Sequence, residues 1–440
     1  MRDITVIGLV FAAAFYAVAH PYVGVLAWTW VSVMNPHRLA WGFAVDFPVA
    51  MTVAIGTMLG LLLTRDRRRL PPLVAPVVVL VLFMLWMCFT SIMAIYPDQI
   101  GEMFSRVMKI LFMVLVAMCV LNTRKHVDQL VWVLVFSLGF YGFKGGLFTI
   151  ATGGHYRVWG PTGSFIEGNN ELALALIMAI PLMRYLQLIS TKRWLRRGLG
   201  LLMALTALAA IGSQSRGALL AILAMAGLMW LRSDHKALSG VVIVVLAASL
   251  VAFMPGTWDA RMQTIDATQL DSSAEGRINA WWMAWNLAKA RPIGGGFEVI
   301  TPELFARYAP NPEDIHAAHS IYFQILGEHG FPGLFLFVLL WWLVWRRAGL
   351  MRRQGAQDPD DAWARHLVAM IQVSLIGYLV GGAFLSLAYF DLPYDLLVLV
   401  VVSRMVLAEK PLAGKLPATG NAIGYEDPRT APASADRRYV

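Results

Sequence analysis

The sequence predicts an all-α polytopic membrane protein, a bundle of about twelve transmembrane helices. Hydrophobic residues make up 58% of its 440 residues and charged residues only 14%, and the mean hydropathy is +0.62. This composition lies far outside that of soluble globular domains. Most apolar runs approach the roughly 20 residues that a helix needs to cross a bilayer. Because the backbone must satisfy its own hydrogen bonds there, we expect these runs to be helices.

The predicted spans follow one another along nearly the whole chain. We treat residues 1–410 as one transmembrane domain. Residues 411–440, rich in Pro, Ala, Gly and charge, are expected to form a disordered cytoplasmic tail. The predicted spans lie near residues 4–19, 44–63, 72–95, 104–121, 127–150, 170–190, 197–213, 216–232, 237–254, 319–345, 364–388 and 391–408.

Lys and Arg gather in short clusters at the ends of these runs, which is typical of cytoplasmic loops. The net charge of +9 is therefore assigned to membrane topology and not to nucleic-acid binding. Only two cysteines are present, both in apolar runs, so we expect no disulfide framework. The basic clusters are Arg65–Arg69, Arg124–Lys125, Lys192–Arg197, Arg232–Lys236 and Arg346–Arg353.

The apolar stretch 22–34 is left outside this count of spans. It is either a re-entrant or interfacial piece that ends at Asn35 and Pro36, or an extension of an uncleaved first helix. An even number of crossings before Arg65 places Arg2 in the cytoplasm, and both termini are then cytoplasmic. Counting 22–34 as a span would break this parity.

Two loops on the far side of the membrane stand out. Residues 151–169 have the Gly and Pro content of an ordered, turn-rich loop. Residues 255–318 form the one long hydrophilic connection, and a loop of that length is usually functional or disordered. Within it, Glu275–Ala290 is expected to form a helix at the membrane interface, where tryptophan is favoured. This helix carries Trp281, Trp282 and Trp285.

Three arginines on this far side of the membrane are candidate ligands of phosphate or pyrophosphate, because a guanidinium presents a planar fork of donors that stays charged. Arg216 lies in SQSRG beside Gln214, where two spans meet, and a charge there is costly unless it serves a function. The alternative is an arginine that snorkels to the interface. Arg277 and Arg157 lie in the two loops, and pairing with a nearby carboxylate is the alternative for both.

The long loop ends in His319 and Ser320, at the start of a predicted span. A histidine at this boundary can be neutral and can reach a substrate hydroxyl as a base, whereas a helix-capping histidine is the alternative. His316 could take either role. Metal binding is not expected, because the sequence offers no third ligand of suitable geometry. Glu328 lies inside the same span and needs a partner, which favours a structural role.

These motifs, in this order, resemble the O-antigen ligase superfamily. The residues that carry the likeness are Arg216 in Ser-Arg-Gly, His319, Ser320 and Tyr322 in His-Ser-x-Tyr, and Glu328 and Gly330 in Glu-x-Gly. The segments VMNPHRLAWGF (33–43) and RVWGPTGSFIEGNN (157–170) look more particularly like the O-glycosylation ligases associated with exosortase systems.

The resemblance implies a GT-C-like fold in the bacterial inner membrane, with the long loop 255–318 in the periplasm. The family transfers a glycan there from undecaprenyl pyrophosphate to an acceptor hydroxyl, without cofactor or metal and with inversion. By resemblance, Arg216, Arg277 and Arg157 would bind the donor pyrophosphate and His319 would activate the acceptor. The supporting residues would be Ser320, Tyr322, Glu328, His316 and Gln214.

The acceptor and the reaction stay open at this point. We place the lipid A core of lipopolysaccharide ahead of a protein side chain, and O-antigen polymerases belong to the same superfamily. A transporter or flippase of lipid-linked glycans is the non-enzyme alternative. Transporters concentrate polar groups near the bilayer midplane, whereas the candidates here gather at one face.

Overall fold

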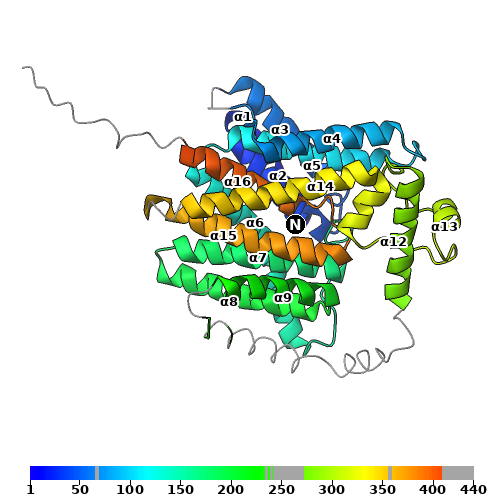
Figure 1. The fold of residues 1–440 in the computed structure, drawn as a ribbon. Coiled ribbons are helices and arrows are strands. Elements are labelled where there is room, and N and C mark those ends of the chain that lie inside the picture. Colours follow the sequence, from blue (N-terminus) through cyan, green and yellow to red (C-terminus); the bar gives the residue numbers. More distant parts are fainter. Residues whose placement is uncertain (65–68, 233–235, 238–239, 241–271, 355–358, 409–440) are drawn as a thin grey trace, which may run out of the picture.

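The computed structural model describes the whole chain except residues 65–68, 233–235, 238–239, 241–271, 355–358 and 409–440 (Figure 1). Eight described helices are long and apolar enough to cross a membrane, and three shorter ones are apolar. This confirms the predicted fold class, a polytopic all-helical membrane protein. Each predicted span coincides with a described helix except 237–254, which lies almost wholly outside the described residues, as does the tail 411–440.

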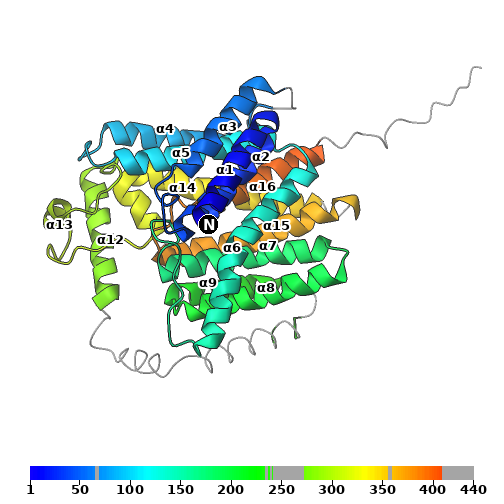
Figure 2. The same ribbon diagram turned by 180° about the vertical axis from the view of Figure 1, so that it is seen from behind.

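The helices from α1 to α9 alternate in direction, as do α14 to α16, and most are joined by short connections. In chain order they are α1 (Arg2–Ala19), α2 (Pro21–Met34), α3 (Val49–Leu63), α4 (Ala75–Ile92), α5 (Gly101–Val120), α6 (Arg124–Ala151), α7 (Asn169–Ile189), α8 (Arg193–Gly212), α9 (Arg216–Leu231), α14 (Ile321–Gln354), α15 (Ala362–Gly381) and α16 (Asp391–Ala408). Figures 1 and 2 show α7, α14 and α15 side by side in the middle of the bundle. The core is continuous through these helices.

The two ends of the bundle differ in chemistry. At one end the Tyr185 hydroxyl of α7 donates to Asp128 of α6 at 2.6 Å, so the last turns of α7 lie beside the first turns of α6. We call this the basic end, because the Lys and Arg clusters at the start of α6 and α8 gather there. At the opposite end the amide of Val158 donates to the carbonyl of Gly212 at 3.3 Å. We call it the loop end; it holds residues 152–168, 212–216 and 309–320.

The stretch 22–34 forms a helix of its own, α2, which corrects the predicted topology. The chain turns back at His20, and α3 then runs beside α1, with the Thr64 hydroxyl donating to the carbonyl of Ala19 at 3.0 Å. Asp3, at the start of α1, accepts from the amide of Gly42 at 2.9 Å, just before α3.

Three passes, not two, therefore separate Arg2 from the basic cluster that begins at residue 65. The far end of α2 belongs to the loop end, because Tyr141 of α6 donates to the carbonyl of Met34 and Arg38 packs beside Gly163. The prediction that Arg2 lies with the basic clusters is wrong: the start of α1 lies at the loop end.

The long loop contributes two helices outside the bundle, α12 (Ser272–Ala290) and α13 (Pro302–Tyr308). The predicted helix 275–290 is thus confirmed as α12. It lies across the loop end, roughly perpendicular to the bundle helices (Figure 1). A small second core, which includes Met283, Leu287 and Phe305, joins α12 to α13. The first part of the predicted loop, up to residue 271, lies outside the described residues.

Candidate functional site

Three helices of the bundle begin close together at the loop end. Asn169, the first residue of α7, donates its side-chain amide to the carbonyl of Ser213 at 2.7 Å, just before α9. A side chain on Gly217 of α9 would lie 3.6 Å from Phe384, and one on Gly382 would touch Ile321, the first residue of α14. Helix N-termini carry partial positive charge and free backbone amides, which favour bound anions.

The turn before α9 is tied to the first loop. The Ser215 hydroxyl caps α9 by accepting from the amide of Ala218 at 3.2 Å. Gln214 has a left-handed backbone, with φ of 56°, and donates to the carbonyl of Gly154 at 3.0 Å. The backbone of Arg216 is thereby fixed at the start of α9, whereas its side chain lies outside the described part of the structure.

Arg277 and His319 lie close to each other beside α7. The Arg277 guanidinium interacts electrostatically with the carboxylate of Glu171, in the first turn of α7. Its Nε is buried and has no hydrogen-bond partner among the described residues. Burial lowers the pKa of His319 below its usual 6.5, and the charges of Arg277 and then His316 lower it further. His319 is therefore a neutral imidazole at neutral pH, next to a cation with an unused donor.

The segment that carries His319 is held in place by α12. Asn279, which is 6% exposed, donates to the carbonyls of Asn311 and Asp314, both at 2.8 Å, and accepts from the amide of Asn311 at 2.9 Å. The Trp281 indole donates to the carbonyl of Ala318 at 2.6 Å. These contacts support the left-handed backbone of His319, whose φ of 42° costs a non-glycine residue about 1 kcal/mol.

The other candidates near His319 have partners within the protein. Ser320 is buried, and its hydroxyl faces the amide of Phe323 at 3.5 Å. The Tyr322 hydroxyl donates to the carbonyl of Leu379 at 2.9 Å. The His316 ring lies 2.7 Å from the carboxylate of Asp314.

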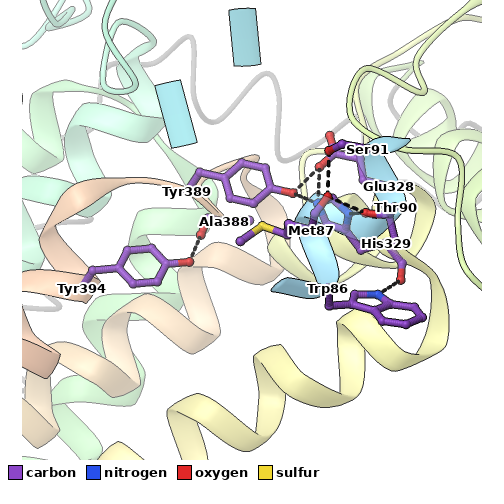
Figure 3. A network of polar contacts seen from close by, with 9 residues as sticks. All are labelled: Trp86, Met87, Thr90, Ser91, Glu328, His329, Ala388, Tyr389 and Tyr394. Carbon is purple, nitrogen blue, oxygen red and sulfur yellow. Dashed lines mark hydrogen bonds and ion pairs between the residues drawn. The ribbon is translucent and has the colours of Figure 1, made fainter. Parts of the chain in front are cut away.

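Glu328 belongs to a buried polar network deeper in the protein (Figure 3). The Tyr389 hydroxyl donates to the Glu328 carboxylate and lies 2.8 Å from Nε2 of His329. Nδ1 of that histidine lies 2.7 Å from the Thr90 hydroxyl, and Trp86 donates to its backbone carbonyl at 2.8 Å. The network joins α4, α14 and the segment before α16.

The network lies next to a kink that divides α14. Gly330 has φ of 66° and ψ of −165°, and a side chain there would clash with the carbonyl of Pro292. The amides of Gly295 and Gly296 donate to the carbonyls of Gly327 and Glu328 at 2.9 and 2.8 Å. The turn that follows α12 therefore packs against the kink, and this contact holds the C-terminal end of α12 against α14.

Arg157 lies apart from Arg277 and His319. It lines a cavity of about 240 Å³, together with Lys144, Tyr141 and Trp159. Its Nε lies 3.5 Å from the side-chain oxygen of Gln214, which is its link to the α9 turn. Within the described ranges, no hydrogen bond or ion pair joins Arg157 to Arg277 or His319.

The described residues contain no group of three or more His, Cys, Asp or Glu side chains that could hold a metal ion. Arg277 and His319 together can bind an anion and accept a proton from a hydroxyl group.

Three residues contribute to this site in ways that the sequence did not predict: Glu171, Asn279 and Trp281. Glu171 is marked only by its place in a first helical turn, and its partner lies more than a hundred residues away. The tryptophan was noticed, but as a membrane anchor. No local pattern indicates the contacts of Asn279, because they depend on how the 309–320 segment folds back.

Two family models match the chain. Residues 1–191 match a family of unknown function, DUF5935, and residues 201–338 match the O-antigen ligase family. No curated protein gives a match. The second match contains Arg216, Arg277 and His319, and it supports the superfamily that the motifs resemble. The chain is thus a multi-pass membrane protein in which residues 201–338 match the O-antigen ligase family.

Proposed function

We propose that this protein transfers a glycan from a polyprenyl pyrophosphate carrier to an acceptor hydroxyl. The match to the O-antigen ligase family supports ligase-type or polymerase-type glycan transfer. The observation that carries the proposal is the neutral His319 beside Arg277, whose Nε is buried without a described partner, where helix N-termini meet. One group accepts a proton and the other binds an anion, which are the two requirements of this reaction.

In the proposed mechanism the imidazole of His319 accepts the proton of the acceptor hydroxyl. The acceptor oxygen then attacks the anomeric carbon, and the bond from that carbon to the pyrophosphate oxygen breaks with inversion. Arg277 and Arg216 stabilise the negative charge that develops on the leaving pyrophosphate, and the N-termini of α7, α9 and α14 add to this field. The left-handed turn at Gln214 directly precedes α9 and Arg216, and Arg157 Nε lies 3.5 Å from the side-chain oxygen of Gln214.

The direction of the reaction across the membrane follows from charge. The basic end carries the Lys and Arg clusters, which favours the cytoplasm, so the loop end faces the periplasm of the inner membrane. Supporting residues there have structural tasks: Ser320 and Tyr322 fix the start of α14, and Asp314 orients His316.

We place the lipid A core of lipopolysaccharide first among acceptors, ahead of a protein side chain and ahead of a second glycan repeat unit, as in polymerases. The test is transfer by purified protein from undecaprenyl-pyrophosphate glycan to each of the three acceptors, without metal or nucleotide. Product with the lipid A core that disappears in His319→Ala supports the proposal. If His319→Ala forms product at the wild-type rate, the proposed role of His319 is wrong. If product forms only with one of the other two acceptors, the choice of the lipid A core is wrong.

A further inference from the structure

An apolar groove runs along α12 on the outside of the protein. Its volume is about 390 Å³, and it lies between α12 and the first turn of α14. The side chains that line it are Ile278, Trp281, Trp282, Trp285 and Phe323. Trp282 is 50% exposed and Trp285 39% exposed. Exposed aromatic surface of this kind next to polar groups marks a binding site for an apolar ligand.

Ile278, the first of the lining side chains, directly follows Arg277 in the chain. Arg277, Trp281 and Trp285 are spaced by four residues, so they lie along one face of α12. At a rise of about 1.5 Å per residue, this face extends roughly 12 Å from Arg277 to Trp285. A cation at one end, followed by an indole surface, suits a ligand with an anionic head and a long apolar tail.

The orientation of α12 fits such a ligand. Because α12 crosses the loop end roughly perpendicular to the bundle helices, it lies along the membrane plane when the bundle spans the bilayer (Figures 1 and 2). A lipid whose tail lies along α12 can therefore enter from the plane of the membrane and bring its head group next to Arg277. The Trp281 indole, which stacks on Phe323 at 5.0 Å with an interplanar angle of 7°, forms the floor of this path.

We propose that the α12 groove binds the pyrophosphate-proximal isoprene units of the donor lipid, so that the polyprenyl chain lies over Trp281, Trp282 and Trp285 while Arg277 holds the pyrophosphate. The assignment rests on the proposed function. A pyrophosphate carries more negative charge than a phospholipid head, so the cation at the start of the groove selects the carrier lipid. Indole rings give a broad, rigid apolar surface that packs against a methyl-branched chain.

The test is a binding measurement without acceptor, so that it is independent of transfer. Purified full-length protein in detergent is titrated with farnesyl pyrophosphate, a short polyprenyl pyrophosphate, and with inorganic pyrophosphate. We expect farnesyl pyrophosphate to bind at least about tenfold more tightly than inorganic pyrophosphate. Trp282→Ala and Trp285→Ala should remove this advantage and leave the affinity for inorganic pyrophosphate unchanged. Both side chains are substantially exposed, so their loss should not disturb the fold.

Trp342→Ala is the matched control, because Trp342 is 53% exposed on α14 and lies outside the groove. It should bind both ligands like the wild type. An unchanged ratio of affinities in the two α12 variants overturns the assignment. So does equal displacement of farnesyl pyrophosphate by excess phosphatidylglycerol, which indicates a general lipid anchor. If the groove binds as expected but no acceptor receives a glycan, the transfer function fails and the lipid site stands.

Discussion

Asn279 offers the sharpest test of how the site is built. Its side chain makes three hydrogen bonds to the 311–314 segment, and none of its partners is a catalytic candidate. A hydrogen bond contributes about 1 kcal/mol to stability. Asn279→Ala therefore destabilises the ordered conformation of this segment by about 3 kcal/mol. Because about 1.4 kcal/mol corresponds to a factor of ten, we expect transfer to fall about 100-fold.

The assay compares kcat/KM for transfer with amide hydrogen exchange over residues 309–319. Exchange should speed up in this segment, because it is released from α12, while the thermal unfolding of the bundle changes little. Asn286→Ala is the control: Asn286 lies on the same helix and makes a single bond, to the carbonyl of Tyr308 at 2.9 Å. Asn286→Ala should lower kcat/KM for transfer by less than about tenfold. Transfer by Asn279→Ala within about threefold of wild type, with unchanged exchange, would refute this reasoning.

Three further substitutions test separate parts of the structure. The rate of transfer should fall as the pH drops through the pKa of His319, which lies below 6.5. Arg277→Gln should move this fall to higher pH, because it removes a positive charge that lowers the pKa of His319. An unshifted pH profile counts against the proximity of Arg277 and His319. Arg216→Lys should raise the KM for the donor at least about tenfold, since a point charge cannot replace the guanidinium fork, and wild-type kinetics would indicate a snorkelling arginine. Tyr389→Phe should lower the free energy of unfolding by about 1–3 kcal/mol, more than Tyr394→Phe, which loses one bond; equal melting temperatures contradict the network.

The bundle was predictable because long apolar runs leave a chain few choices in a bilayer. The 14-residue helix α2 was not, because it is shorter than the roughly 20 residues used to recognise a span. It is nevertheless well buried against its neighbours, and its polar residue Ser32 donates to Asp391. Its stability comes from packing inside the protein, which hydropathy along the sequence does not measure.

The chemical candidates were predictable from residue type, but their grouping was not. Arg277 and His319 were named separately, and the structure brings them together through a segment held by Asn279 and Trp281. Arg157 looked equivalent to Arg277 in the sequence, yet it lies in another cavity beside Lys144. Contacts between distant segments decide these positions, and a single sequence carries no record of them.

The contacts of α7 join two regions of the chain that match different family models. The two matched families meet between residues 191 and 201, at the connection from α7 to α8. Asn169 and Glu171 lie in the region that matches the first family model, whereas their partners Ser213 and Arg277 lie in the region that matches the second. The region that matches the family of unknown function is thus part of the wall around the candidate residues. A chimera that replaces only one of the two regions would therefore separate Asn169 and Glu171 from the partners that this chain supplies, and would leave the site with one mismatched half.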